Sequence, residues 1–379
     1  MDEPTVRGEA AELAPALERL RRYVERETPT GDAERNNALA AELARDLSAA
    51  GAEVEQIDAP GAGSHVLARV AGREPAERPL LLLGHMDTVY PVGTLASRPF
   101  TVRGDRAEGP GIYDMKTGLV VMVEALSRLR ATGSAPRRPV TILITCDEEA
   151  GSGTSRGLIE REARGAGAVL VLEPPLPDGA AKTARKGVAI YYLTTTGRSA
   201  HAGIEPERGV SAIVELAHQI LRVIALEDPS RGTTINVGVV HGGTASNVIP
   251  ERAQAEIDVR FSTAAELKRV DAGLRALTPV LNGAGVEITG GENRPPLERT
   301  DGVVELYGRV RAIAAELGYE LGEGSTGGGS DGCYTAALGV PTLDGLGVRG
   351  GGAHATDEHI IVSDLPRRIA LLVRLLERL

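Results

Sequence analysis

The strongest constraint on the fold is a set of short apolar runs that alternate with longer stretches of helical periodicity. PLLLLGH (79–85), PVTILITCDEE (139–149) and AVLVLEPP (168–175) are almost uniformly apolar until their last residues. Residues 9–24, 35–50 and 114–133 place apolar side chains three or four positions apart, as an amphipathic helix does. Continuous apolar strands separated by helices indicate an α/β fold with a mostly parallel sheet covered on both faces.

The middle of the chain has a different pattern. From about residue 187, GVAIYYLTTTGRSAHAG alternates in period two, which is typical of an antiparallel strand with one solvated face. A helix over 209–225, strands over 233–243 and 251–262, and a helix over 264–282 complete a β-α-β-β-α order. Because 379 residues exceed the usual size of a single core, we predict a catalytic domain of residues 1–186 and 295–379 and an inserted two-layer α+β domain of residues 187–294.

The composition argues against several classes of partner. The formal charge of −10 and the pI of about 5.4 disfavour nucleic acid and anionic membranes. No apolar run approaches the roughly 20 residues needed to cross a bilayer. The acidic start of the chain is unlike a secretory signal, which predicts a cytoplasmic location. Cys146 and Cys333 are too few for a disulfide framework and are predicted to be buried and reduced.

Side chains that can bind a metal or carry a proton follow the apolar runs of the larger domain. They are His85, Asp87, Asp114, Asp147, Glu148, Glu149, Glu173 and His354. Each alone has a structural explanation, such as a helix N-terminus for Asp114 or a solvated turn for the three consecutive acids. Ligands of open α/β sheets bind beyond the carboxyl ends of the strands, so these side chains are expected to converge. Their joint appearance favours a metal site.

Charge counting favours two metals over one. Around a single Zn²⁺, three carboxylates would leave a negative centre and a poor Lewis acid. Two Zn²⁺ ions balance three carboxylates and one hydroxide, with a carboxylate and a water as bridges. Histidine and carboxylate ligands without cysteine suit Zn²⁺, with Co²⁺ or Mn²⁺ as alternatives. Residues two apart in an extended chain point the same way, so Asp87 is expected to lie beside His85.

The sequence is similar to the co-catalytic zinc hydrolases that include glutamate carboxypeptidase, aminoacylase, acetylornithine deacetylase and succinyl-diaminopimelate desuccinylase. The matching motifs occur in order over about residues 80–364. They are GHMDTVYP, GPGIYDMKTG, TCDEEAGSGTS, LEP, GRSAHAG, GGTASNVIP, DVR, TGGGSDG and GAHATDEH. The glutamate carboxypeptidase branch resembles the chain most. The resemblance implies a zinc-peptidase-type three-layer catalytic domain with an inserted lid and dimerisation domain, and a homodimer formed through that domain.

The resemblance also implies a role for each matched residue. His85, Asp114 and Glu173 would bind one Zn²⁺, while Asp114, Glu149 and His354 would bind the other. Asp87 would orient His85, and Glu148 would act as general base. His201 would stabilise the tetrahedral oxyanion, from its own or the partner subunit. The implied substrate-binding residues are Asn247, Arg260, Arg294, Gly328 and Gly329.

The substrate stays open between two amide-bond chemistries. A metallocarboxypeptidase releasing a C-terminal glutamate or a similar amino acid is the first expectation, and an N-acyl-amino-acid deacylase is the alternative. In the glutamate-specific pattern a lysine after LEP binds the side-chain carboxylate, and here Lys182, Arg185 and Lys186 all lie nearby. A non-catalytic binding protein of the same fold should have lost a ligand or the base, yet all are present.

Overall fold

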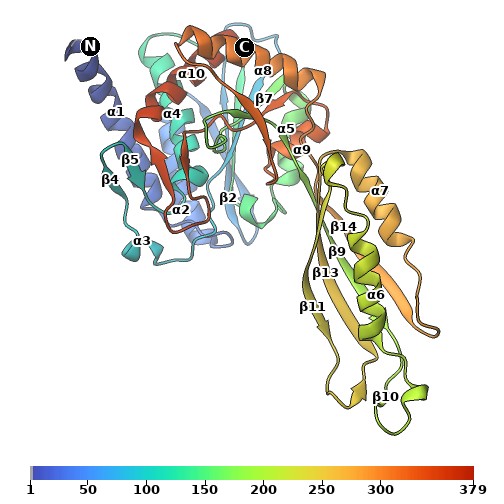
Figure 1. Ribbon diagram of the computed structural model, residues 1–379. Helices are drawn as coiled ribbons and strands as arrows, with labels where there is room; N and C mark the ends of the chain where they lie inside the picture. Colours follow the sequence, from blue (N-terminus) through green and yellow to red (C-terminus); the bar gives the residue numbers. More distant parts are fainter. Residues whose placement is uncertain (1–2) are drawn as a thin grey trace. The chain divides into compact units, whose positions relative to one another are not determined.

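The chain forms two compact units, described here from a computed structural model that covers the backbone of residues 3–379 and the side chains of residues 13–379. Unit 1 comprises residues up to Thr183, together with Arg299–Thr326 and Ser330–Leu379. Unit 2 comprises Ala184–Glu298 and Gly327–Gly329 (Figure 1). The larger unit is therefore discontinuous in sequence. The break before the smaller unit lies three residues earlier than expected, and the break after it lies four residues later.

A six-stranded sheet forms the centre of unit 1, in the order β1-β2-β6-β3-β7-β16. The bounds are β1 Glu53–Ala59, β2 Gly63–Val70, β3 Leu80–His85, β6 Val140–Thr145, β7 Ala168–Val171 and β16 Thr342–Leu343. Strands β6, β3, β7 and β16 are parallel, while β1 and β2 form an antiparallel hairpin at one edge. The carboxyl ends of β3, β6 and β7 thus lie at one edge of the sheet.

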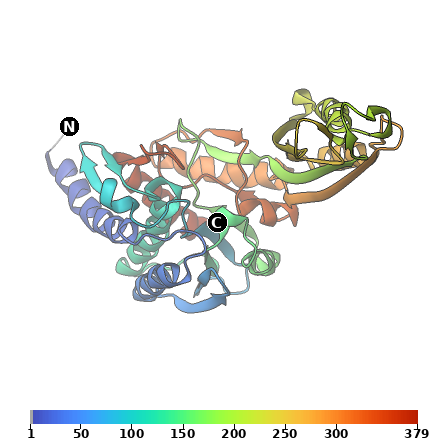
Figure 2. The same ribbon diagram turned by 90° about the horizontal axis from the view of Figure 1, so that it is seen from below.

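Helices cover both faces of this sheet, as the continuous apolar runs predict (Figures 1 and 2). Leu80 and Leu82 pack into the core beneath the larger helical layer, and Leu81 and Leu83 pack against the smaller one. The larger layer contains α1 Glu3–Val24, α2 Ala33–Ala49, α4 Thr117–Ala131, α8 Asp301–Glu316 and α10 Leu365–Arg378. The smaller layer contains α5 Arg156–Gly165 and α9 Gly332–Ala337. This is the predicted three-layer α/β fold.

Two small sheets and a short helix, α3 (Thr94–Ser97), complete unit 1. One sheet has the order β17-β18-β5-β4, with bounds β4 Thr101–Arg103, β5 Arg106–Glu108, β17 Gly350–Gly351 and β18 His359–Ile361. The other pairs β8 Ala181–Arg185, which runs into unit 2, with β15 Glu323–Thr326. The loop between β17 and β18 carries His354. In the part of the chain that the structure describes, no helix meets the length and apolarity of a membrane span.

Unit 2 is a four-stranded antiparallel sheet with two helices on one face (Figure 1). The strand order is β11-β13-β9-β14, with bounds β9 Gly187–Thr196, β11 Thr234–Gly242, β13 Arg252–Phe261 and β14 Gly285–Arg294. The helices are α6 Ala212–Ile224 and α7 Ala264–Arg275. Alternate residues of β9 and β13 form the core beneath these helices. A separate ribbon pairs β10 Ala200–His201 with β12 Val248–Ile249.

The structure differs from the sequence-based expectations at three elements. Strand β14 was not expected, because glycines at 285, 290 and 291 interrupt its period-two pattern. Helix α7 ends at Arg275 rather than near residue 282. Asp114 does not open a helix: α4 begins at Thr117, and Asp114 has the non-helical dihedrals φ −115° and ψ 96°. Its side chain is therefore carried by an irregular turn.

Candidate metal centre and active site

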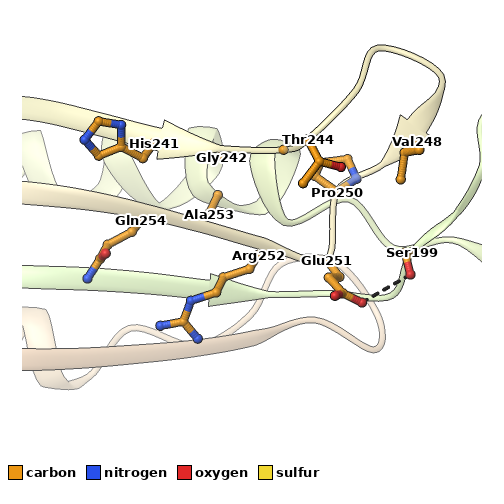
Figure 3. A pocket seen from close by; sticks show the side chains of 11 residues that line it. Ser199, His241, Gly242, Thr244, Val248, Pro250, Glu251, Arg252, Ala253 and Gln254 are labelled. Carbon is orange, nitrogen blue, oxygen red and sulfur yellow. Dashed lines mark hydrogen bonds between the residues drawn. The ribbon is translucent and has the colours of Figure 1, made fainter.

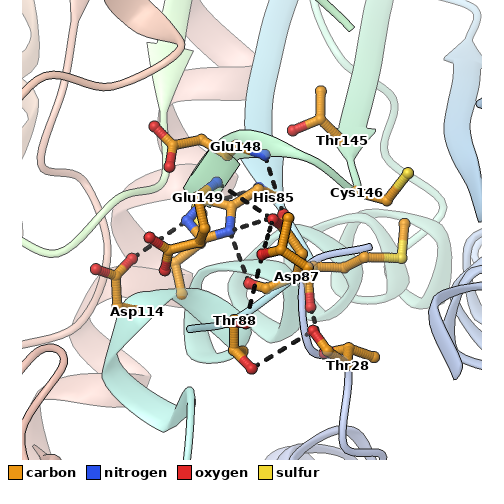
Figure 4. Close-up of polar contacts among 12 residues, drawn as sticks. Thr28, His85, Asp87, Thr88, Asp114, Thr145, Cys146, Glu148 and Glu149 are labelled. Carbon is orange, nitrogen blue, oxygen red and sulfur yellow. Dashed lines mark hydrogen bonds and ion pairs between the residues drawn. The ribbon is translucent and has the colours of Figure 1, made fainter. Parts of the chain in front are cut away.

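The ends of β3 and β6 bring the first predicted site residues together (Figure 4). His85 is the last residue of β3 and is buried. Its Nδ1 lies 3.0 Å from the backbone oxygen of Asp87. A carbonyl oxygen can only accept, so Nδ1 carries the proton and donates it there. The Nε2 atom of a neutral His85 ring is thus left as a ligand.

Asp114 lies between two histidines, with one carboxylate oxygen toward each. Its Oδ1 is 3.2 Å from Nε2 of His85, and its Oδ2 is 3.5 Å from Nε2 of His354. Glu173 completes the first group, with Oε1 3.4 Å from Nε2 of His85. Glu149 completes the second group, with Oε1 3.2 Å from Nε2 of His354. The five predicted ligands therefore form two sets, each of one histidine and one glutamate, which share Asp114.

The donor atoms are close enough to surround metal ions. In each set the histidine Nε2 lies 3.2–3.5 Å from the carboxylate oxygens. One ligand atom each of His85, Asp114 and Glu149 also lies within 4.8 Å of the others, so the two sets adjoin. Ligand–metal bonds of about 2.0–2.2 Å put two ligands on one ion no more than roughly 4.4 Å apart. Imidazole nitrogen with carboxylate oxygen is a donor set that first-row divalent ions accept. The residues present fit divalent cations: His85 with Glu173 and His354 with Glu149 would each hold one, and Asp114 would contribute an oxygen to both sets.

When no cation is bound, the negative carboxylates of this cluster and its histidines shift one another's pKa values. Hydrogen bonds to Asp114 and Glu149 raise the pKa of His354 to about 10. Burial alone would lower the pKa of His85, but its contacts with Asp114, Asp87 and Glu173 raise it well above the usual value. Burial also acts to raise the pKa of Asp114, yet its bonds to both histidines outweigh that effect and lower it. The carboxylates thus favour the protonated, positively charged form of both histidines.

We expect metal binding to compete with these protons. A histidine with a raised folded-state pKa stabilises the metal-free fold fully below its unfolded pKa of about 6.5. That contribution is lost as the pH rises through the folded pKa of about 10. The affinity for a divalent cation should therefore rise between pH 6 and 9, with release of about two protons per pair of histidines near pH 7. Calorimetry in buffers of different ionisation enthalpy measures this release, and a pH-independent affinity would contradict it.

Asp87 does more than lie beside His85. Its Oδ1 is 3.5 Å from Nδ1 of His85, whereas the backbone oxygen of Asp87 is 3.0 Å from the same nitrogen. The backbone N–H groups of Glu148 and Glu149 point to its two carboxylate oxygens, each at 3.2 Å. The Thr30 hydroxyl donates to Oδ2 at 2.8 Å. Asp87 therefore fixes the short turn Glu148–Ala150 as well as the imidazole.

Glu358 is a site residue that sequence reasoning missed. Its buried carboxylate accepts from the backbone N–H groups of Gly111 at 2.8 Å, Tyr113 at 2.8 Å and Asp114 at 3.0 Å. It follows His354 by four residues in the same loop. One carboxylate thus connects the irregular turn that carries Asp114 with the loop that carries His354. The available signal was an acid within GAHATDEH, the motif that contains the predicted ligand His354.

The predicted residues His201 and Asn247 lie together in unit 2. His201 in β10 pairs with Val248 of β12, and the N–H of Ala202 donates to the Asn247 backbone oxygen at 2.9 Å. The side chain of His201 is exposed, with Nδ1 accepting from the Gly203 N–H at 3.1 Å. A pocket beside this ribbon is lined in part by Ser199 and Glu251, and the Ser199 hydroxyl donates to the Glu251 carboxylate at 3.1 Å (Figure 3). Both residues are exposed, His201 within the ribbon and Asn247 immediately before β12.

The predicted carboxylate-binding residues also belong to unit 2. Arg260 and Arg294 both pair with Val188, from β13 and β14, so they lie on one row of the sheet. Arg294 is buried, and a Cβ on Gly329 would come within 2.7 Å of its Cδ. Arg260 forms an ion pair with Asp258 at 2.8 Å. The glycine loop therefore packs directly on one of the two arginines.

The three basic residues after LEP occupy different positions. Arg185 is buried, and its Nη1 donates to the backbone oxygens of Gly328 at 3.2 Å and Gly329 at 2.9 Å. Lys182 is buried in unit 1, and its backbone pairs with Asp344. Lys186 is partly exposed in unit 2. Arg185 thus contacts the glycine loop, residues Gly327–Gly329, directly.

A mostly parallel α/β sheet beside whose carboxyl edge two histidine–glutamate sets share one aspartate is typical of a metal-dependent hydrolase. The sequence model of peptidase family M20/M25/M40 matches residues 81–378. The chain belongs to this family and is a hydrolase that acts on amide bonds. The fold and the family resemblance expected from the motifs are confirmed.

Two relatives and two solved structures illustrate the similarity. The chain is 36% identical over 367 residues to carboxypeptidase G2 of Pseudomonas sp. (strain RS-16), covering 95% of this chain and 88% of the relative. It is 31% identical to succinyl-diaminopimelate desuccinylase of Methylobacterium sp. (strain 4-46), with 92% of each covered. The aminopeptidase PepT of Bacillus cereus has a TM-score of 0.80 at 24% identity, covering 96% of this chain and 98% of that one. A dinuclear metal-binding M20 peptidase of Bacillus subtilis has a TM-score of 0.69 at 16% identity, covering 98% and 100%.

Proposed function

We propose that the protein is a dizinc hydrolase that cleaves an amide bond and releases a free amino acid, with a C-terminal glutamate or similar residue as the first candidate. The observation that carries this proposal is the position of Asp114, whose two carboxylate oxygens face two separate histidine–glutamate sets. Three carboxylates and two neutral histidines suit a pair of divalent cations. Zn²⁺ is the proposed metal, and Co²⁺ or Mn²⁺ could replace it.

Glu148 would be the general base. When bound, two divalent cations would polarise the scissile carbonyl and acidify a water held between them. Glu148 follows the buried strand β6 on the turn that Asp87 holds by backbone hydrogen bonds, next to the ligand Glu149. From there its carboxylate would accept the proton of the attacking water and deliver it to the leaving nitrogen. Such positioned proton transfer contributes about 10²–10⁴ in rate.

The residues of unit 2 would bind and polarise the substrate. His201 would donate a hydrogen bond to the oxyanion that develops on the carbonyl oxygen. Asn247, on the same ribbon, would contact the substrate beside it. Arg260 and Arg294 would bind the carboxylate of the substrate through their planar guanidinium groups. The backbone of Gly328 and Gly329 would approach the same carboxylate, because glycine allows close contact.

The relatives support both the carboxypeptidase and the deacylase chemistry. Carboxypeptidase G2 favours the first, and the succinyl-diaminopimelate desuccinylases favour the second. Zinc-loaded protein should be assayed against dipeptides ending in Glu, Asp or Ala and against N-acyl amino acids, each with a C-terminal amide as control. A free α-carboxylate should be required in every case. Equal turnover of the amides would contradict carboxylate recognition by Arg260 and Arg294.

A homodimer through unit 2 is part of the proposal. Strand β11 is an edge of its sheet, and an unprotected edge can pair with another chain. Helix α6 packs over the same part of the sheet and exposes large apolar side chains. These exposed side chains are Ile213, Val214, Leu221 and Ile224 on α6, with Val239 and Val240 on β11. A two-fold interface would cover the edge and this apolar surface together.

Leu221→Glu is expected to separate the subunits. Leu221 is 70% exposed in the single chain. Its burial in an interface contributes about 2 kcal/mol per subunit, so the dimer Kd should rise about a thousandfold. Light scattering after size-exclusion chromatography measures the mass. Leu317→Glu, at an exposed leucine of unit 1, is the matched control and should remain dimeric. A dimeric Leu221→Glu variant would show that this surface is not the interface.

A further inference from the structure

We infer that Asp331 is a positioning residue that holds both ends of the turn carrying Glu148 and Glu149. The inference rests on the proposed function, because it takes Glu148 as the base and Glu149 as a metal ligand. Asp331 belongs to the motif TGGGSDG but is separated from the turn by more than 170 residues of sequence. It acts through these two glutamates.

The contacts of Asp331 bracket the turn. The hydroxyl of Thr145, the last residue of β6, donates to its Oδ2 at 3.0 Å. The hydroxyl of Ser152, which follows the turn, donates a short hydrogen bond to its Oδ1. One carboxylate thus binds the chain before Glu148 and after Glu149. Asp331 is 3% exposed, so these hydrogen bonds form away from bulk water.

Ser152 needs such support because its backbone is strained. Its φ of 62° lies in the left-handed region, which a non-glycine residue adopts only when its surroundings impose it. The side-chain bond to Asp331 and the backbone bond from the Ser152 N–H to Asp147 O at 2.8 Å both hold this conformation. Without the carboxylate, Ser152 could relax toward an ordinary φ, which would displace the turn.

Asp331 and Asp87 have complementary positions around the turn. Asp87 accepts from the backbone N–H groups of Glu148 and Glu149 at the middle of the turn. Asp331 accepts from side-chain hydroxyls at its two ends. The side chain of Asp147 faces elsewhere, toward the N–H groups of Thr154 and Ser155. Two buried carboxylates therefore determine where the base and the ligand lie.

Asp344 provides a matched control. It is a buried aspartate in the adjoining polar network and accepts from the Ser330 hydroxyl at 2.5 Å and the Gly345 N–H. Both of these donors lie outside the turn. Asp331→Asn and Asp344→Asn thus make the same chemical change in similar surroundings, and the first alters the carboxylate that accepts from Thr145 and Ser152 at the two ends of the turn.

The test measures Zn²⁺ affinity by competition with a chromophoric chelator, together with kcat and KM at saturating Zn²⁺. Asp331→Asn should weaken Zn²⁺ binding and lower kcat by about tenfold or more, with little change in KM. Asp344→Asn should lower the melting temperature and leave Zn²⁺ affinity within about twofold. Equal effects of the two variants on Zn²⁺ affinity would overturn the inference.

Thr145→Val keeps the test valid where Asp331→Asn does not fold. It removes one hydroxyl at nearly constant volume and should weaken Zn²⁺ binding severalfold, whereas unchanged binding would overturn the inference. Ser152→Ala removes the hydroxyl and keeps the strained φ, whereas Ser152→Gly removes the hydroxyl and the strain together. Comparing the two variants separates the contribution of the hydrogen bond from that of the backbone strain. Failure of the wild-type protein to bind Zn²⁺ at all would instead reject the proposed function.

Discussion

Glu148→Gln is expected to retain two Zn²⁺ ions per subunit and to lose turnover by about 10²–10⁴-fold. Glutamine has the same shape but cannot accept the proton from the attacking water. The hydrogen bond from the residue 148 N–H to Asp87 belongs to the backbone and is unaffected. The metal sites should therefore be intact while the proton transfer is lost. Elemental analysis and kcat at saturating substrate measure the two quantities.

The neighbouring variant Glu149→Gln separates base from ligand. Oε1 of Glu149 faces His354 at 3.2 Å in the second metal set. Glu149→Gln should therefore weaken the binding of one Zn²⁺, and added Zn²⁺ should restore part of its activity. Added Zn²⁺ should not restore Glu148→Gln. A Glu148→Gln enzyme with wild-type kcat would refute the assignment of the base.

His201→Ala is expected to lower kcat by about 10²–10³-fold, the cost of one oxyanion donor. Stability should be almost unchanged, because the side chain is exposed and its known hydrogen bond is a local one from the Gly203 N–H. KM should change little, since the charge on the carbonyl oxygen develops in the transition state. Steady-state kinetics and thermal unfolding test both parts. A large loss of stability would indicate a structural role instead.

Mixing the two inactive variants determines which subunit supplies His201. A mixed dimer of Glu148→Gln and His201→Ala contains one intact site if the histidine acts across the interface. Random exchange should then restore about a quarter of wild-type activity, because half of the dimers are mixed and each has one working site. Action within one subunit predicts no recovery. Leu221→Glu added to both variants should abolish any recovery.

The convergence of the proposed metal ligands could be predicted because strand direction places three of them. His85, Glu149 and Glu173 follow strands β3, β6 and β7, which are parallel neighbours, so their carboxyl ends share one edge. Apolar runs identify such strands without knowledge of their partners. The structure brings these residues together with Asp114 and His354, as expected.

The supporting carboxylates could not be predicted, because their partners are distant in the sequence and lie in irregular segments. Glu358 binds backbone N–H groups more than 240 residues away, and backbone donors leave no mark on the sequence. The hydroxyl partners of Asp331 are common residue types with no distinctive spacing. Strand β14 was missed for a related reason: its glycines suit sharp backbone geometry and weaken the strand pattern.

The most direct measurement is anomalous X-ray scattering at the zinc edge from crystals of the zinc-loaded protein. If two Zn²⁺ ions share Asp114, two peaks should lie about 3.5–4 Å apart. Each should lie about 2.0–2.2 Å from a different carboxylate oxygen of Asp114. One peak should also contact His85 and Glu173, and the other Glu149 and His354. A single peak, or two peaks of which only one contacts Asp114, would contradict the proposed dizinc site.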